Sequence, residues 1–208
     1  MTQIGVFASG SGSNFQSIFR KTRDGYISAQ IGTLITDNPH AGAIEFAREN
    51  NLPVYIVRPK NYPSEEAFGD ALLQILEKHH IDLIVLAGFL KKIPENVIAK
   101  YVNRIVNIHP ALLPAFGGKG MYGKHVHAAV YRSGVKFSGV TIHFVTNEFD
   151  AGPIILQKVV NIEDCHSPDE IARKVLMQEH IAYPEALKRI MENEMEVTGN
   201  RVEFCRGN

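Results

Sequence analysis

The chain has 208 residues, of which 45% are apolar, and its 22 basic side chains equal its 22 acidic ones. This length suits one domain with a substantial core, and the charge balance provides no overall field for nucleic acid or an anionic membrane. The two cysteines, Cys165 and Cys205, form no CxxC pair, and no signal-peptide pattern or apolar run of about 20 residues is present. We expect a cytoplasmic protein with small-molecule partners, either a monomer or a homodimer.

The amino terminus predicts a strand, a glycine-rich loop and a helix. Residues Gln3–Ala8 form the strand, Ser9–Ser13 the loop, and the helix begins near Asn14. Loop amides, seryl hydroxyls and the positive end of a helix together suit a phosphate. The dinucleotide fingerprint GxGxxG fails at Phe15, and no Gly-Lys-Ser/Thr triplet of a P-loop is present. A single phosphate is therefore favoured, and an ordinary tight turn is the alternative.

Alternation of strands and helices continues through the first half of the chain. Strands are expected at Gln30–Thr36 and Val54–Val57, and a helix at 64–79 opens on Ser64. Asp37 follows the earlier strand and is interpreted as a turn or helix-cap residue. We predict an α/β fold: a doubly wound, mainly parallel, twisted sheet of about seven strands with helices on both faces and a Rossmann-like amino-terminal half.

The most apolar run, Ile81–Ala87, predicts a central strand, and a helix is expected at about 94–101. The loop Gly88–Pro94 lies at the carboxyl end of that strand, where a flat ligand can rest on backbone and apolar side chains. Asn107 and His109 lie two residues apart at the end of the next strand, before Pro110. An amide and an imidazole so placed can stabilise a developing oxyanion, and a buried core histidine is the alternative.

The segment Gly117–His127 is glycine-rich and basic, and it predicts either a mobile lid over a substrate or a plain connection. Its histidines, together with His109 and His143, suggest zinc only weakly, because no regular ligand pattern includes a cysteine or paired carboxylate. No metal is expected.

Two consecutive strands, Gly139–Val145 and Ile154–Val160, predict an antiparallel extension of the sheet. Asp150 lies in the loop between them, and the glycine after it would let the backbone approach a ligand. Next to an imidazole this carboxylate would raise the imidazole pKa and keep it protonated near neutral pH.

The last predicted helix begins with a Ser167 cap and Pro168. Glu179 falls on its apolar arc, and either a ligand or a salt bridge and solvation at the helix end could satisfy the carboxylate. The tail Met195–Asn208 predicts a hairpin turning on Gly199–Asn200.

Five motifs occur in order over most of the chain: SGSGSN, AGFLKKI, NIHPALLPAF, GVTIHFV followed by DAGPIILQ, and QEHIAYP. Together they resemble the phosphoribosylglycinamide formyltransferase family, which is folate-dependent. The resemblance implies a single formyltransferase domain over 1–208, with a ribonucleotide-binding half at about 1–100 and a catalytic, folate-binding half at about 101–208. One departure is Ser64–Glu66, where the family often has an arginine that meets the folate.

The same resemblance implies roles for individual residues. It makes Asn107, His109 and Asp150 the catalytic trio, which would stabilise the oxyanion as the acceptor amine attacks 10-formyltetrahydrofolate directly. The acceptor, glycinamide ribonucleotide, would contact Gly12, Ser13, Asn14 and Glu179, and the folate would contact Leu90, Lys91, Lys92, Ile93 and Asn107. The alternatives are a formyltetrahydrofolate hydrolase and a non-catalytic folate or nucleotide-binding protein.

Overall fold

The computed structural model describes residues 1–205. The chain divides into two compact units, Met1–Val106 and Asn107–Asn208. The division falls within the strand β5 (Ile105–His109), a few residues after the boundary expected between the two halves.

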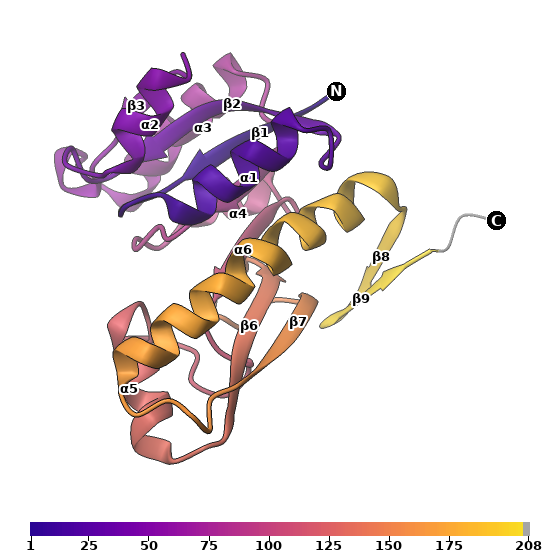
Figure 1. Ribbon diagram of the computed structural model, residues 1–208. Coiled ribbons are helices and arrows are strands. Elements are labelled where there is room, and N and C mark those ends of the chain that lie inside the picture. Colours follow the sequence, from indigo (N-terminus) through magenta and orange to yellow (C-terminus); the bar gives the residue numbers. More distant parts are fainter. Residues whose placement is uncertain (206–208) are drawn as a thin grey trace. The chain divides into compact units, whose positions relative to one another are not determined.

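The first unit is a parallel α/β layer. Its elements are β1 (Thr2–Phe7), α1 (Ser13–Arg23), β2 (Ala29–Thr36), α2 (Ala43–Glu49), β3 (Val54–Ile56), a 3-10 helix η1 (Pro59–Asn61), α3 (Glu65–Lys78), β4 (Leu83–Leu86) and α4 (Glu95–Lys100). The strand order is β3-β2-β1-β4, and each pair of neighbours is parallel. Helix α1 lies in front of these strands and α3 behind them (Figure 1). The predicted doubly wound, mainly parallel architecture is confirmed.

Apolar runs place the strands of this unit at the centre of its core. All four residues of β4 are buried, as are the last four of β1, because helices cover both faces. In the parallel register Phe7 is opposite both Ile35 and Leu86, so the three strands end side by side. Their following loops therefore meet, and the Ser9 amide donates to the carbonyl of Gly88 over 3.1 Å.

The second unit contains the end of β5 and an antiparallel region. Its elements after β5 are α5 (Lys124–Ser133), β6 (Phe137–Phe144), β7 (Ile154–Asn161), α6 (Pro168–Glu192), β8 (Met195–Thr198) and β9 (Arg201–Phe204). Strands β6 and β7 pair antiparallel, as predicted, and α6 packs against both of them and against α5 (Figure 1). Ser167 caps α6 by accepting from the Glu170 amide, which confirms the predicted start of the helix.

Two features of this unit differ from the sequence-based expectation. Lys124–His127 is the first turn of α5 and not part of an irregular segment, because Val126, His127 and Val130 form a buried helical face. The hairpin of β8 and β9 is confirmed, but β9 also pairs with β7 through Ile154 and Arg201. Residues 1–205 therefore contain nine strands and not about seven. The last three residues of the predicted tail lie outside the described part of the chain.

Candidate active site

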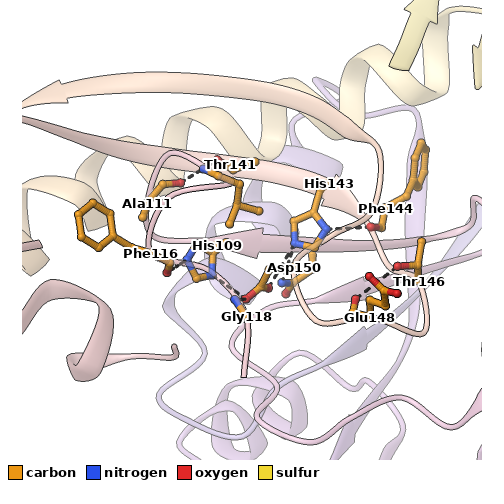
Figure 2. Close-up of polar contacts among 12 residues, drawn as sticks. His109, Ala111, Phe116, Gly118, Thr141, His143, Phe144, Thr146, Glu148 and Asp150 are labelled. Carbon is orange, nitrogen blue, oxygen red and sulfur yellow. Dashed lines mark hydrogen bonds and ion pairs between the residues drawn. The ribbon is translucent and has the colours of Figure 1, made fainter. Parts of the chain in front are cut away.

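His109, the predicted catalytic histidine, lies at the end of β5 and is almost completely buried. Its Nε2 donates to the carbonyl of Phe116 over 2.8 Å, so Nε2 carries a hydrogen (Figure 2). Its Nδ1 is 3.5 Å from Oδ2 of Asp150, which is close enough for an ion pair and longer than a normal hydrogen bond. Nδ1 of His109 is therefore the ring atom at which a proton can be gained or lost.

Asp150 is held by the backbone that follows β5. Its Oδ2 accepts from the Gly118 amide over 2.9 Å (Figure 2), and its own backbone has a φ of 55°, a left-handed conformation that aspartate tolerates better than most residues. A Cβ on Gly117 would lie 3.3 Å from Cβ of Asp150 and 2.4 Å from the side chain of Leu113. The first residues of the predicted lid are thus fixed against the carboxylate, and a side chain at position 117 would have to displace that of Leu113.

The sequence-based expectation that Asp150 keeps the imidazole of His109 protonated near neutral pH is not met. Burial lowers the pKa of His109, and this effect exceeds the increase caused by Asp150 and by the hydrogen bond to Phe116. The net direction is therefore downward, so the neutral imidazole is favoured. For Asp150, burial raises the pKa, but His143, His109 and the Gly118 amide outweigh burial and hold it below its usual value. The carboxylate stays charged next to a neutral ring.

His143 is a site residue for which the sequence suggested only a weak role as a metal ligand. It lies on β6, fully enclosed, and its Nδ1 donates to the carbonyl of Phe144 over 2.8 Å (Figure 2). Its Nε2 is 3.2 Å from Nδ2 of Asn107 and 3.7 Å from Oδ1 of Asp150. The alternation of GVTIHFV placed His143 and Thr141 on one face of the strand, and this was the signal that could have identified it.

Thr141 fixes the chain immediately after His109. Its hydroxyl donates to the carbonyl of Ala111 over 2.7 Å (Figure 2) and accepts from the amide of Leu113 over 3.0 Å. Gln157 on β7 donates to the same hydroxyl and to the carbonyl of Leu113. The turn that follows β5 is consequently held by hydrogen bonds to both β6 and β7.

The glycine expected to admit a ligand next to Asp150 has a different role. A Cβ on Gly152 would lie 1.9 Å from the carbonyl oxygen of Phe144. Glycine is required here because two segments of backbone pass close together, and this close contact supports the carbonyl that accepts from His143.

In the first unit, the predicted phosphate loop enters α1 through Gly12. This residue has a φ of 79°, and a Cβ added to it would lie 2.7 Å from Cβ of Ala43. The first turn of α1 contains no acidic residue, and no side chain caps its amides. Ser13 is half-buried, and Asn14 is buried. Such a helix start can accept an anion.

Four of the five residues expected to contact folate follow β4 in the first unit, and their surroundings differ. Leu90 is 57% exposed, whereas Ile93 is buried. Nζ of Lys92 is 3.6 Å from Glu65 and 3.9 Å from Glu95, so Glu65, near the position where the family often has arginine, pairs with a predicted folate residue.

Asp37 links this loop to the phosphate loop and is not a helix cap, because Gly42 is the N-cap of α2. It accepts from the Ser9 hydroxyl over 2.5 Å, and its other oxygen is 3.6 Å from Nζ of Lys91. The Ser9 hydroxyl in turn accepts from the Leu90 amide over 3.1 Å. These contacts join loops far apart in sequence, which explains why local pattern reading did not identify the role of Asp37.

Glu179 lies on the buried face of α6, as predicted from helical periodicity.

In the described range 1–205, no group of three or more histidine, cysteine, aspartate or glutamate side chains could hold a metal ion. No helix in this range has the length and apolar character to cross a membrane. The expectation of a metal-free site stays a prediction.

Comparison with known proteins identifies the family to which this chain belongs. A formyl transferase family model matches residues 2–187. The chain belongs to the formyl transferase family. Phosphoribosylglycinamide formyltransferase of Bacillus subtilis is 36% identical over 191 residues, which cover 92% of this chain and 95% of that protein. The resemblance expected from the sequence is confirmed.

A plant relative and a solved structure are also similar to this formyl transferase. Chloroplastic phosphoribosylglycinamide formyltransferase of Arabidopsis thaliana is 42% identical over 93% of this chain, which spans 66% of that protein. The chain likewise spans 62% of the chloroplastic relative from Vigna unguiculata. The structure of glycinamide ribonucleotide transformylase 1 from Symbiobacterium toebii has a TM-score of 0.93 and 37% identity, with 99% of this chain and 95% of the other covered.

Proposed function

We propose that this formyl transferase moves the formyl group of 10-formyltetrahydrofolate to the primary amine of glycinamide ribonucleotide, a step of purine synthesis. The observation that carries the proposal is the pairing of buried His109 with Asp150 at 3.5 Å, at the end of the strand that also bears Asn107. The names of two relatives of which this chain covers 95% support the same acceptor.

The first step forms a bond between the amine nitrogen and the formyl carbon. The formyl oxygen becomes an oxyanion, to which the Nδ2 group of Asn107 donates a hydrogen bond. The nitrogen, now positive, gives one proton to Nδ1 of His109. The lowered pKa of His109 suits this role, because the ring begins as a neutral base.

In the second step the bond between the formyl carbon and N10 of the folate breaks. Nδ1 of His109 returns its proton to N10, the carbonyl re-forms, and the products are formylglycinamide ribonucleotide and tetrahydrofolate. Between the steps the imidazolium lies 3.5 Å from the Asp150 carboxylate, which stabilises it, while Nε2 stays bonded to Phe116. No covalent enzyme intermediate is required.

Other residues bind the two substrates in this proposal. The phosphate binds at the amino-terminal end of α1 through Gly12, Ser13 and Asn14, and Glu179 contacts the sugar or glycinamide part. The residues from Leu90 to Ile93, with Asn107, bind the pterin. Holding two large substrates in line can contribute roughly 7–11 kcal/mol toward the barrier. The cytoplasmic location and the choice between monomer and homodimer stay predictions.

One assay tests the reaction. The protein is incubated with 10-formyltetrahydrofolate, with and without glycinamide ribonucleotide, and the release of tetrahydrofolate is followed. Release only with the acceptor is the expected result. Release without it would identify a hydrolase, and no release in either case would identify a binding protein. His109→Ala serves as the inactive control, with binding of the ribonucleotide measured separately by calorimetry.

A further inference from the structure

We infer that His143 is a positioning residue that orients the carboxamide of Asn107 for the reaction. The inference rests on the proposed function, because orientation matters only if Asn107 donates to an oxyanion. Nε2 of His143 is the partner of Nδ2 of Asn107, at 3.2 Å, and His143 is 2% exposed.

The hydrogen positions of His143 follow from its other nitrogen. The Phe144 carbonyl can only accept, so Nδ1, 2.8 Å away, must carry a hydrogen. In the neutral ring Nε2 then has a lone pair, which is an acceptor. The tautomer is fixed by the strand itself, since the accepting carbonyl belongs to the next residue of β6.

This tautomer sets the direction of the Asn107 amide. An acceptor at Nε2 of His143 requires the NH2 end of the carboxamide and excludes the oxygen end, because two acceptors at 3.2 Å repel. The NH2 group has two hydrogens, so one binds His143 and the other remains for the oxyanion. If the amide were reversed, its oxygen would face the developing negative charge. The oxyanion would then lose its hydrogen bond from Asn107.

The surroundings leave His143 little freedom to change its role. The close approach of Gly152 supports the Phe144 carbonyl, and Oδ1 of Asp150 lies 3.7 Å from Nε2 of His143. The negative charge on that side disfavours rotation of the carboxamide oxygen of Asn107 toward it. His143 therefore connects a rigid strand to a side chain that could otherwise flip.

Two substitutions separate positioning from packing. In His143→Gln the terminal amide reaches the place of Nε2 and its oxygen can accept from Asn107, whereas the bond to Phe144 is lost. In His143→Asn the shorter amide can still donate to Phe144, as Nδ1 does, but nothing reaches Asn107. A purely structural role predicts that asparagine substitutes better, and a positioning role predicts that glutamine does.

We expect His143→Gln to keep kcat within about threefold and His143→Asn to lose about 10–100-fold, part of the 10²–10³ that one oxyanion donor is worth. KM values for both substrates should stay unchanged. In an Asn107→Ala background the loss caused by His143→Asn should vanish. Equal kcat values for the two variants, a better asparagine variant, or a loss that persists without Asn107 would overturn the inference.

A second readout does not depend on activity. Nitrogen NMR of His143 should give the tautomer protonated at Nδ1, and the Asn107 side-chain amide should exchange slowly in wild type and His143→Gln but rapidly in His143→Asn. Thermal unfolding checks that both variants fold. If wild type transfers no formyl group, the proposed function fails while these spectra still test the geometry; a tautomer protonated at Nε2 would refute the geometry itself.

Discussion

Replacing Asp150 by asparagine removes the charge next to His109 and keeps the shape of the side chain. The amide oxygen can still accept from the Gly118 amide, which is 2.9 Å from Oδ2 in wild type. Asp150 raises the pKa of His109 against the dominant effect of burial. Without the carboxylate the pKa of His109 must fall further.

The energetic cost follows from the 3.5 Å separation of Nδ1 and Oδ2. Removing an opposite charge at such a distance destabilises the imidazolium formed during transfer by about 1.4–4 kcal/mol. We expect kcat to fall about 10–10³-fold if that species precedes the rate-limiting barrier.

Proton NMR titration of the histidine rings measures the pKa of His109 in both proteins, and steady-state assays measure kcat. Asp164→Asn is the matched control, because Asp164 is an exposed carboxylate paired with Lys174 on another part of the unit. Binding of the ribonucleotide phosphate should be unaffected in both variants. An unchanged or raised His109 pKa in Asp150→Asn, or a kcat within about threefold of wild type, would refute the reasoning.

Three further predictions follow from burial and backbone geometry. The free energy of unfolding should fall as pH drops through about 6.5, because burial depresses the pKa values of both His109 and His127 and the unfolded chain then binds protons first. Denaturant titrations across this range measure the slope, which His127→Gln should reduce. Gly12 and Gly25 both have a φ of 79°, so alanine at either position adds a strain of about 1–2 kcal/mol. Only the Cβ of Gly12→Ala would also meet Ala43, so only this variant should raise the KM for the ribonucleotide. Gly152→Ala should destabilise by about 3 kcal/mol and lower kcat, because its Cβ would lie 1.9 Å from the Phe144 carbonyl; an unaltered melting temperature would contradict this.

Hydrophobic periodicity was enough to predict most of the fold. The runs at β1, β2 and β4 are short, apolar and separated by helical patterns, which leaves few alternatives to a parallel sheet. Helix α5 was not predicted because the glycines before it dominated the local composition, although its buried face repeats at helical spacing. The pairing of β9 with β7 was beyond sequence reasoning, since only one residue pair specifies it.

The candidate site was predictable where chemistry follows from position in a strand. Asn107 and His109 share a strand end, so their proximity needs no tertiary information. The partners of these residues come from elsewhere in the chain, as the contacts of Asp150 with Gly118 and of His143 with Asn107 illustrate. The net direction of the His109 pKa depends on how deeply the ring is buried, which a sequence does not give.

The direction of the His109 pKa also decides the expected pH dependence of the reaction. A ring that starts neutral and takes a proton from the amine loses activity when acid protonates it beforehand, so kcat should rise with pH through a value below about 6.5 and then level off.

A ring that had to be protonated at the start, as first expected from the sequence, would instead lose activity as pH rose through its pKa. Measuring kcat from pH 5 to 8, at saturating substrate, distinguishes the two. A profile that falls across this range would show that the carboxylate of Asp150 outweighs burial in the complex, and it would restore the imidazolium as the starting state.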